Sequence, residues 1–437
     1  MRGPNDNGRF HVIATQAMAP HMPLNSVTAQ ARRRIRCMTS EAAFDPARQA
    51  LAREYGRARR ALALAEILFG GAYLAAWALA PWAAQLRDLL TDAADRWRLP
   101  SGPAEASVLL GIALAFAAPA WVLTLPLDLY SSYDLPHRFG LSNQSWRGWV
   151  VDRVKGLLLG AALGGPMLLG LYALIRSAGK LWWLWASASY AGLAVIMTTL
   201  APVLLIPIFN RLRPLGEAHR DLSDRLTRLA ETAGVRVRSV DTIDLSRRTN
   251  AANAMLIGLG RTRRIALGDT LLESFDPDEI ETVLAHELGH HAHGDTSVGI
   301  LIQSAAVAAV FFLESVVLAA LVRSGHLMSA ADPAGWPTFV LTWSLLAFVE
   351  APGLHLYSRW RERRADDFAL RLASNPEAFI RAMIRLGDQN LAEADPPGWA
   401  VILFGTHPAL GLRLARARRV IGQPHTAGSN EGLPAGG

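Results

Sequence analysis

The stretch EIETVLAHELGHHAHG, residues 279–294, contains the pattern H-E-x-x-H and carries the signals of a helix. Asp276 can cap this helix, Pro277 suits its first position, and Glu279 stands where a capping box needs a carboxylate. Gly294 is suited to end it. The apolar residues that recur at helical spacing are Ile280, Val283, Leu284 and Leu288. We therefore expect an amphipathic helix with one buried face.

Two histidines of this helix are spaced to bind one metal ion. His286 and His290 are four residues apart, about 40° of helical rotation, so both imidazoles leave the same face one turn apart. Glu287 lies one step around the helix, where it can reach a water beside the ion but is badly placed as a ligand. Two imidazoles, a carboxylate and an open position form a catalytic zinc site, so we expect Zn²⁺ with Glu287 as the general base.

The motif alone does not establish a metal site, because H-E-x-x-H also occurs by chance on surface helices. His291 and His293 add imidazoles nearby but point to other faces, so we expect them in outer contacts or at the surface. Cys37 is the only cysteine, which excludes an intrachain disulfide and a thiolate zinc site. A third ligand must therefore come from elsewhere in the chain.

The composition indicates a membrane protein. Of the 437 residues, 51% are hydrophobic and only 19% are charged, which is too apolar for an ordinary soluble protein. The net charge of +7 does not indicate nucleic-acid binding, because no basic stripe is interleaved with aromatic residues. The arginines cluster beside apolar segments, as topology signals do. The expected partner is a lipid bilayer, and no nucleic acid.

Six apolar segments are long enough to cross a bilayer. They cover residues 61–83, 104–127, 156–175, 181–208, 298–322 and 336–357. Glu314 in the fifth segment and Glu350 in the sixth are unusual at membrane depth, and we expect both to face inward. The sequence predicts a mainly α membrane protein with a small α+β domain.

The distribution of arginine gives an orientation under the positive-inside rule. The segment 1–60 is basic, so we expect it in the cytoplasm and the loop 84–103 outside. Counting the spans places the polar regions 209–297 and 358–423 together in the cytoplasm. We expect disorder up to about residue 40 and in the tail 424–437. The sequence leaves open whether translation starts at Met1 or at Met38.

A small α+β unit lies between the fourth and fifth spans. We expect a helix over 216–233, a strand in VRVRSVDTID at 235–244, and a hairpin of AMLIG at 254–258 with RIALG at 264–268. An extended peptide can bind to such an edge by adding a strand. The predicted domain order is 1–60 basic region, 61–208 four-helix membrane domain, 209–297 catalytic region, 298–357 two spans, 358–423 second catalytic region and 424–437 tail.

Glu362 is the candidate for the third ligand. The sixth span continues as a helix in SRWRERRADDFALRLA, residues 358–373, which places Glu362 on the same side of the membrane as His286 and His290. Asp366, one turn on, can accept a hydrogen bond from the distal nitrogen of a ligating histidine and fix its tautomer. Further helical or apolar segments are expected from Asn375, at 399–404 and over 410–421.

Several stretches besides the metal motif form a recognisable set. They are LPLDLYSSY, HRFGLSNQSWRGWVVDRVK, PVLLIPIFNRLRPL, NAMLIG, RIALGDTLL, AHELGHH, SRWRERRAD and THPALGLRL, and they span residues 120–420. With them the sequence resembles the type I CAAX prenyl endopeptidases, integral-membrane zinc peptidases of the gluzincin class. The resemblance implies a helical barrel around an intramembrane chamber. It also implies one zinc ion bound by His286, His290 and Glu362, with Glu287 activating water.

The resemblance assigns roles around the metal as well. It implies that the backbone at Asn253 and Ala254 aligns the substrate peptide. It implies that His407, in the THP motif, helps to hold the oxyanion, with Arg413 nearby. Alternatively, His407 only neighbours the N-terminal cap of a helix, beside Pro408, and Asp366 has a purely structural role.

The sequence departs from the family pattern at three positions. His137 stands where an acidic residue is common, and Leu141 and Ser142 stand where Phe-Asn is common. Eukaryotic members also have seven spans where we count six, so a seventh stays open. These differences bear on whether the substrate is prenylated. We expect a bacterial inner-membrane member that cleaves peptides or proteins, membrane-associated or lipidated ones among them.

Two other functions stay open. A quality-control protease of the bacterial heat-shock membrane type also carries H-E-x-x-H on the cytoplasmic side, but such chains are usually shorter and lack a region like residues 120–155. An inactive membrane scaffold or transporter is a different class altogether. It is disfavoured because the three ligands, the base and His407 are all intact.

Overall fold

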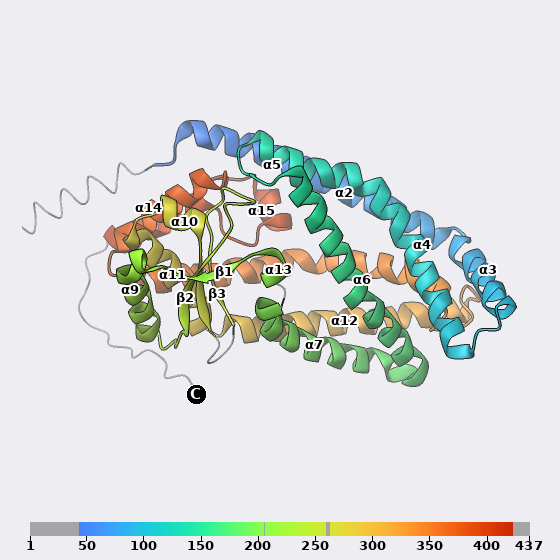
Figure 1. Ribbon diagram of the computed structural model, residues 1–437. Helices are drawn as coiled ribbons and strands as arrows, with labels where there is room; N and C mark the ends of the chain where they lie inside the picture. The colour runs from blue at the N-terminus through green and yellow to red at the C-terminus, as the bar shows by residue number, and fades with distance from the viewer. Residues whose placement is uncertain (1–42, 205, 259–262, 423–437) are drawn as a thin grey trace, which may run out of the picture. The chain divides into compact units, whose positions relative to one another are not determined.

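The computed structural model describes residues 43–204, 206–258 and 263–422. The disorder predicted for residues 1–40 and 424–437, and the choice between Met1 and Met38, lie outside the described residues. Long helices dominate the chain, and shorter helices surround a small sheet (Figure 1). The prediction of a mainly α membrane protein with a small α+β domain is confirmed.

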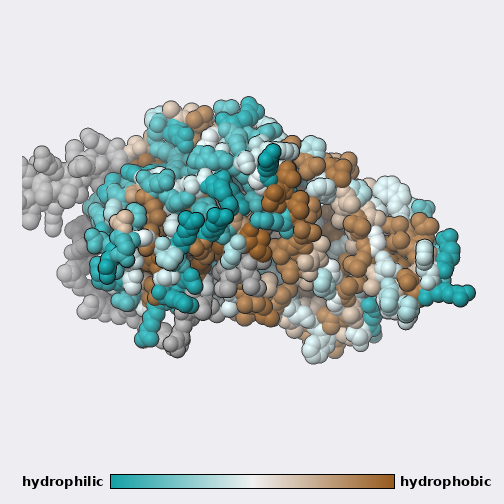
Figure 2. Space-filling model, in the orientation of Figure 1, coloured by the Kyte–Doolittle hydropathy of each residue, from teal (hydrophilic) through white to brown (hydrophobic). Residues whose placement is uncertain are grey.

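Six of the described helices are long and apolar enough to cross a membrane, as predicted. They are α2 (Pro46–Leu79), α4 (Ser101–Leu129), α6 (Trp146–Ser177), α7 (Trp182–Leu204), α12 (Asp295–Arg323) and α13 (Trp336–Leu372). Helix α4 continues through a π-helical turn at Tyr130–Asp134 into α5 (Leu135–Arg138). Figure 2 shows hydrophobic residues gathered over these long helices and hydrophilic residues over the part that contains the sheet.

Two boundaries in the amino-terminal half differ from the prediction. Helix α2 begins at Pro46 and not near residue 61, because Asp45 caps it by accepting bonds from two backbone N–H groups. The segment 84–103, predicted as a loop, is largely helix α3 (Trp82–Arg96). Both extra helical stretches are polar on one side, so a search for apolar segments passes over them.

The fifth span carries a buried carboxylate, as expected. Glu314 is 0% exposed on α12, which packs against α7 and α13. Glu350 on α13 is half-buried. The apolar core around these helices includes Tyr172, Trp182, Val307, Phe311, Leu318 and Phe339. Glu314 is thus enclosed by protein, where acidic groups of membrane helices are normally found, whereas Glu350 is only partly covered.

The sheet contains the predicted hairpin and one strand that was not predicted. Its strands are β1 (Leu212–Pro214), β2 (Ser239–Ile243), β3 (Ala254–Ile257) and β4 (Arg264–Gly268), in the order β1-β2-β4-β3. β3 and β4 are antiparallel, with Ala254 opposite Leu267, and β2 runs parallel to β4. β1 has only three residues and ends in proline, so it carries no strand pattern. β3 lies at the edge.

Helix α11 (Pro277–Ala292) holds the H-E-x-x-H motif. The predicted capping box is present: the Asp276 carboxylate accepts a hydrogen bond from the backbone N–H of Glu279, and the backbone N–H of Asp276 donates to the Glu279 carboxylate. Gly294 follows with a φ of 64°, a left-handed conformation that favours glycine. The prediction of a single buried face is wrong, because Glu279, Glu281 and Thr282 are buried together with the apolar positions. Neighbouring helices cover α11 on several sides.

Shorter helices complete the part of the chain around α11. They are α9 (Arg220–Thr232), α10 (Asp269–Ser274), α14 (Pro376–Gln389), α15 (Gly398–Phe404) and α16 (Leu410–Gly422). All except α10, which was not predicted, lie close to the expected segments. α11 packs against α9, α13 and α14, and it also touches β3. Glu281 of α11 accepts hydrogen bonds from Arg225 of α9 and from the N–H and hydroxyl of Ser374. These bonds fix the motif helix against its neighbours.

Helices α11 and α13 approach each other closely at Gly289. A Cβ on this glycine would lie 3.0 Å from Cα of Ala365 and 3.1 Å from Cβ of Phe368. We predict that Gly289→Leu destabilises the protein by about 1–3 kcal/mol, the usual effect of overpacking a filled core. Thermal unfolding in detergent would measure this. The control is Gly160→Leu on α6, where a Cβ meets nothing within 4 Å. Equal unfolding temperatures for the two variants would contradict the close approach.

Candidate metal centre

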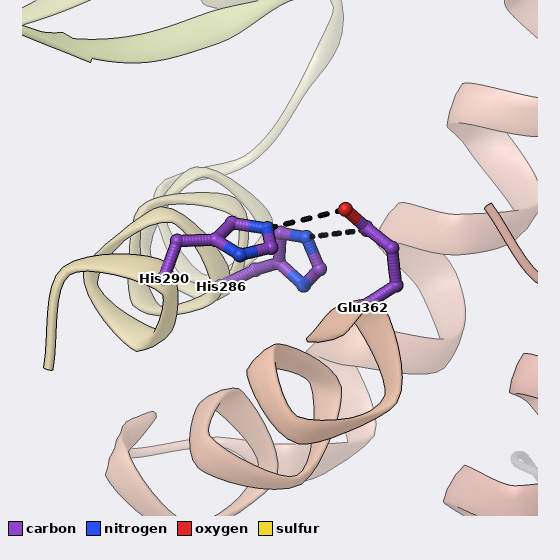
Figure 3. Close-up of side chains that lie close together, drawn as sticks. All are labelled: His286, His290 and Glu362. Atoms are coloured by element: carbon purple, nitrogen blue, oxygen red, sulfur yellow. Dashed lines mark ion pairs between the residues drawn. The ribbon is translucent and has the colours of Figure 1, made fainter. Parts of the chain in front are cut away.

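Three side chains from two helices converge on one point (Figure 3). His286 and His290 project from α11 and Glu362 from α13, and one ligand atom of each lies within 4.8 Å of the others. The Nε2 atoms of His286 and His290 lie 3.2 Å and 3.3 Å from the two oxygens of Glu362. The structure therefore brings together the three residues that the sequence selected, although helix α12 and most of α13 separate Glu362 from the histidines along the chain.

The other nitrogen of each histidine faces a carboxylate. Nδ1 of His286 lies 2.9 Å from Asp366, and Nδ1 of His290 is bonded to Asp295 at 2.8 Å. Such outer carboxylates fix the tautomer and leave Nε2 free to bind a metal. Asp366 was a candidate for this place, whereas Asp295 was missed. Its signal was modest: an acidic residue in the first turn of the helix that follows the motif.

The charge balance at this point favours a cation. Burial lowers the pKa of His286, but the carboxylates of Asp366 and Glu362 raise it by more, to about 9. The pKa of His290 is raised in the same way, because Glu362 and Asp295 outweigh burial. Burial raises the pKa of Glu287 above its usual range. An ion held here would replace protons on the two imidazoles, since histidine binds metals in its neutral form.

The donor set fits a metal such as zinc. It consists of two imidazole nitrogens and one carboxylate, without a thiolate. Oε2 of Glu362 is buried, and ring nitrogens of His286 and His407 lie 3.2 Å and 2.8 Å from it. A buried carboxylate needs a positive partner, and neutral imidazoles do not supply one. A metal ion between the three side chains would supply one.

One cavity, of about 710 Å³, opens on this centre. His286, Glu287 and His407 line it on the metal side, and Ala254 of β3 lines it together with Asn253, the residue before that strand. The predicted base and the predicted substrate segment therefore face one space. The cavity is also lined by residues that were not selected from the sequence: Tyr55, Gly56, Arg59 and Arg60 of α2, and Asn390 and Leu391 after α14.

His407 and Arg413 contact different carboxylates of this arrangement. Nδ1 of His407 lies 2.8 Å from Oε2 of Glu362, and its side chain is 60% exposed. Arg413 is buried and donates two bonds to Asp366, at 2.8 Å and 2.6 Å. The charge of Arg413 is thus paired with Asp366, and this pair fixes the carboxylate that faces Nδ1 of His286. His407 has the exposure that a residue needs to meet a substrate.

The remaining histidines of the motif helix lie outside the ligand set. The ring of His293 packs against Phe368 at 5.8 Å, and burial lowers the pKa of both His291 and His293. This agrees with the expectation of outer or surface positions. His137 has both ring nitrogens within hydrogen-bond reach of backbone carbonyls of Tyr133 and Gln144. Of the two other departures from the family pattern, Leu141 is buried and Ser142 forms an isolated β-bridge with Thr249.

Two family profiles match the chain in succession. "CAAX prenyl protease N-terminal, five membrane helices" matches residues 31–211, and "Peptidase family M48" matches residues 217–421. Among solved structures, the fold is similar to that in "Crystal Structure of S. mikatae Ste24p", with a TM-score of 0.74 and 22% identity over 91% of this chain and 100% of that one.

Curated relatives agree with these profiles. The chain is 28% identical to "Uncharacterized metalloprotease YhfN" of Bacillus subtilis, over 71% of this chain and 73% of that protein. It is 27% identical to "CAAX prenyl protease 1 homolog" of Oryza sativa, over 71% of this chain and 74% of that protein. The profiles, the relatives and the metal centre lead to one assignment: the chain belongs to peptidase family M48, as an integral-membrane metallopeptidase of the CAAX prenyl protease type.

Proposed function

We propose that this protein is a zinc endopeptidase that cleaves peptide bonds at the cytoplasmic surface of a membrane. The observation that carries this proposal is the convergence of His286, His290 and Glu362 beside Glu287, at a cavity that an edge strand also lines. When bound, zinc would polarise the scissile carbonyl and make water more acidic. His286, His290 and Glu362 would hold it.

The side chains around the centre have distinct tasks. Glu287 lies on the cavity wall, and burial raises its pKa, which suits a carboxylate that must accept a proton from water and pass it to the leaving amine. His407 would donate to the oxygen on which negative charge develops. Asp366 and Asp295 keep the imidazoles oriented. The substrate would pair with the free edge of β3 near Asn253 and Ala254.

The proposed substrates are peptides or proteins at the membrane. The name of the Oryza sativa relative points to prenylated substrates. Helices long and apolar enough to cross a membrane would keep the cavity near a lipid-anchored substrate. The alternative of a heat-shock-type protease is weakened, because the amino-terminal profile of the CAAX proteases covers residues 31–211. The alternative of an inactive scaffold is weakened by the complete set of side chains around the metal centre.

We predict that the protein binds one zinc ion and that the ion depends on the histidines. His286→Ala or His290→Ala should remove both metal and activity. Glu287→Gln should keep the metal and lower turnover by about 10²–10⁴-fold, because a base is lost and no ligand is. His291→Ala is the control on the same helix and should keep both. Elemental analysis and cleavage of a generic peptide would test this; a wild-type protein without zinc would refute it.

We predict that His407→Ala lowers the catalytic rate by about 10²–10³-fold while the metal content stays unchanged, the loss expected for one oxyanion donor. Asn253→Ala should act partly through KM, because the edge of β3 contacts the peptide before as well as during reaction. Steady-state kinetics on one peptide series would separate the two effects. An unchanged rate in the His407 variant would leave that residue with the role of a helix-cap neighbour.

The orientation of the protein in the membrane can be tested with two cysteines, one in the domain that contains the sheet and one in the connection between α12 and α13. Glu273 is exposed beside the sheet, and Ser329 is exposed in the connection between the two helices. In a protein without Cys37, we expect an impermeant thiol reagent on intact cells to label Ser329→Cys but not Glu273→Cys. This follows from the arginine distribution. The reverse pattern of labelling would place the metal centre outside.

A further inference from the structure

The free edge of β3 is defined by the direction of its backbone groups. Among the described residues β3 pairs with β4 alone, and the N–H of Gly268 donates to the carbonyl of Asn253 at 2.9 Å. The backbone groups of Asn253 therefore face β4. Because successive residues of a strand face opposite sides, the N–H and C=O groups of Ala252 and Ala254 point toward the free edge.

A side chain from another element already occupies this edge at Ala252. Asn390 ends helix α14, and its Oδ1 accepts from the N–H of Ala252 at 3.0 Å, while its Nδ2 donates to the carbonyl of the same residue at 3.3 Å. One side-chain amide thus pairs with both backbone groups, as a neighbouring strand would. The edge is closed at Ala252 and open at Ala254, which lines the cavity together with His286 and Glu287.

The residue after Asn390 shows how firmly this amide is held. Leu391 is 3% exposed and has a φ of 49°, a left-handed conformation that non-glycine residues adopt only where their surroundings enforce it. It packs in a small apolar cluster with Ala52 of α2 and with Leu141 of the loop that follows α5. Segments from the membrane half of the chain therefore fix the position of Asn390.

We propose that Asn390 is a positioning residue that sets the register of the substrate peptide. By closing the edge at Ala252, it makes Ala254 the first position at which an extended peptide can pair, so one particular peptide bond comes to lie at the metal centre. The inference rests on the proposed function, in which the peptide adds to the edge of β3. The register of the substrate peptide is thus set by the contact between Asn390 and Ala252, outside the metal site.

The test compares Asn390→Ala with Gln389→Ala on a peptide that the wild type cuts at one bond. Gln389 donates to the carbonyl of Asn250 at 2.7 Å, so its removal loosens the same segment without opening the edge at Ala252. For Asn390→Ala we expect products cut at more than one bond, and kcat/KM for the wild-type bond about tenfold lower. A peptide shifted along the edge could also pair with Ala252, and the gain of about one hydrogen bond is worth about that factor. For Gln389→Ala we expect a single cut and a KM within about twofold of the wild type.

Two further measurements distinguish positioning from general damage. Metal content should be unchanged in both variants. Asn390→Asp keeps the acceptor for the N–H of Ala252, so it should restore a single cut. The proposal is overturned if Asn390→Ala cuts only the wild-type bond, or if both alanine variants scatter the cuts equally. If the wild type with its zinc cut no peptide at all, the proposed function would fail.

Discussion

The metal centre depends on the close crossing of two helices. α11 and α13 meet where Gly289 offers no side chain against Ala365 and Phe368, and this contact lies within the same turns that carry His290 and Glu362. A Cβ at Gly289 would lie only 3.0–3.2 Å from atoms of Ala365 and Phe368, so α11 and α13 would have to shift to accept a larger residue there. The distance between the histidines and the glutamate is therefore set by backbone packing, and the ligands follow from it.

Buried charges on both helices are satisfied by partners from elsewhere in the chain. Arg225 from α9 and Ser374 from the end of α13 hold Glu281, and Arg413 from α16 holds Asp366 with two bonds. Leaving such a carboxylate without a partner would be far more costly than the usual worth of a surface ion pair. These contacts explain why α11 can be buried almost all round although it carries acidic residues.

The amino-terminal half of the chain contributes more than a membrane anchor. The polar start of α2 lines the cavity with Tyr55 and Arg59. The loop after α5 joins the segment before β3, where Ser142 bridges to Thr249, and Arg248 forms two bonds to Asp152 of α6. These contacts connect the membrane helices to the strand edge at which we propose that the substrate binds. Peptide alignment and membrane packing are thus linked through a few polar groups.

The sequence by itself determined the features that depend on local periodicity and spacing. The H-E-x-x-H spacing and the cap at Asp276 predicted helix α11, the hydropathy predicted six spans, and the alternating segments predicted the hairpin of β3 and β4. Glu362 could be selected because a continuous helix and the count of spans placed it on the same side as the histidines. All of these signals lie within one element or in the order of elements.

Only the tertiary structure decided which distant side chains meet. Asp295 and Asn390 look like ordinary polar residues at helix ends, and their roles depend on where His290 and the backbone of Ala252 lie in space. The sequence did not predict the first turns of α2, because they are polar, or strand β1, because it has only three residues. Local pattern cannot report the contact of Asn390 with Ala252, because folding brings these residues together across 138 positions of the chain. Asp295 is only five residues from His290, but the left-handed turn at Gly294 lies between them and decides whether they meet.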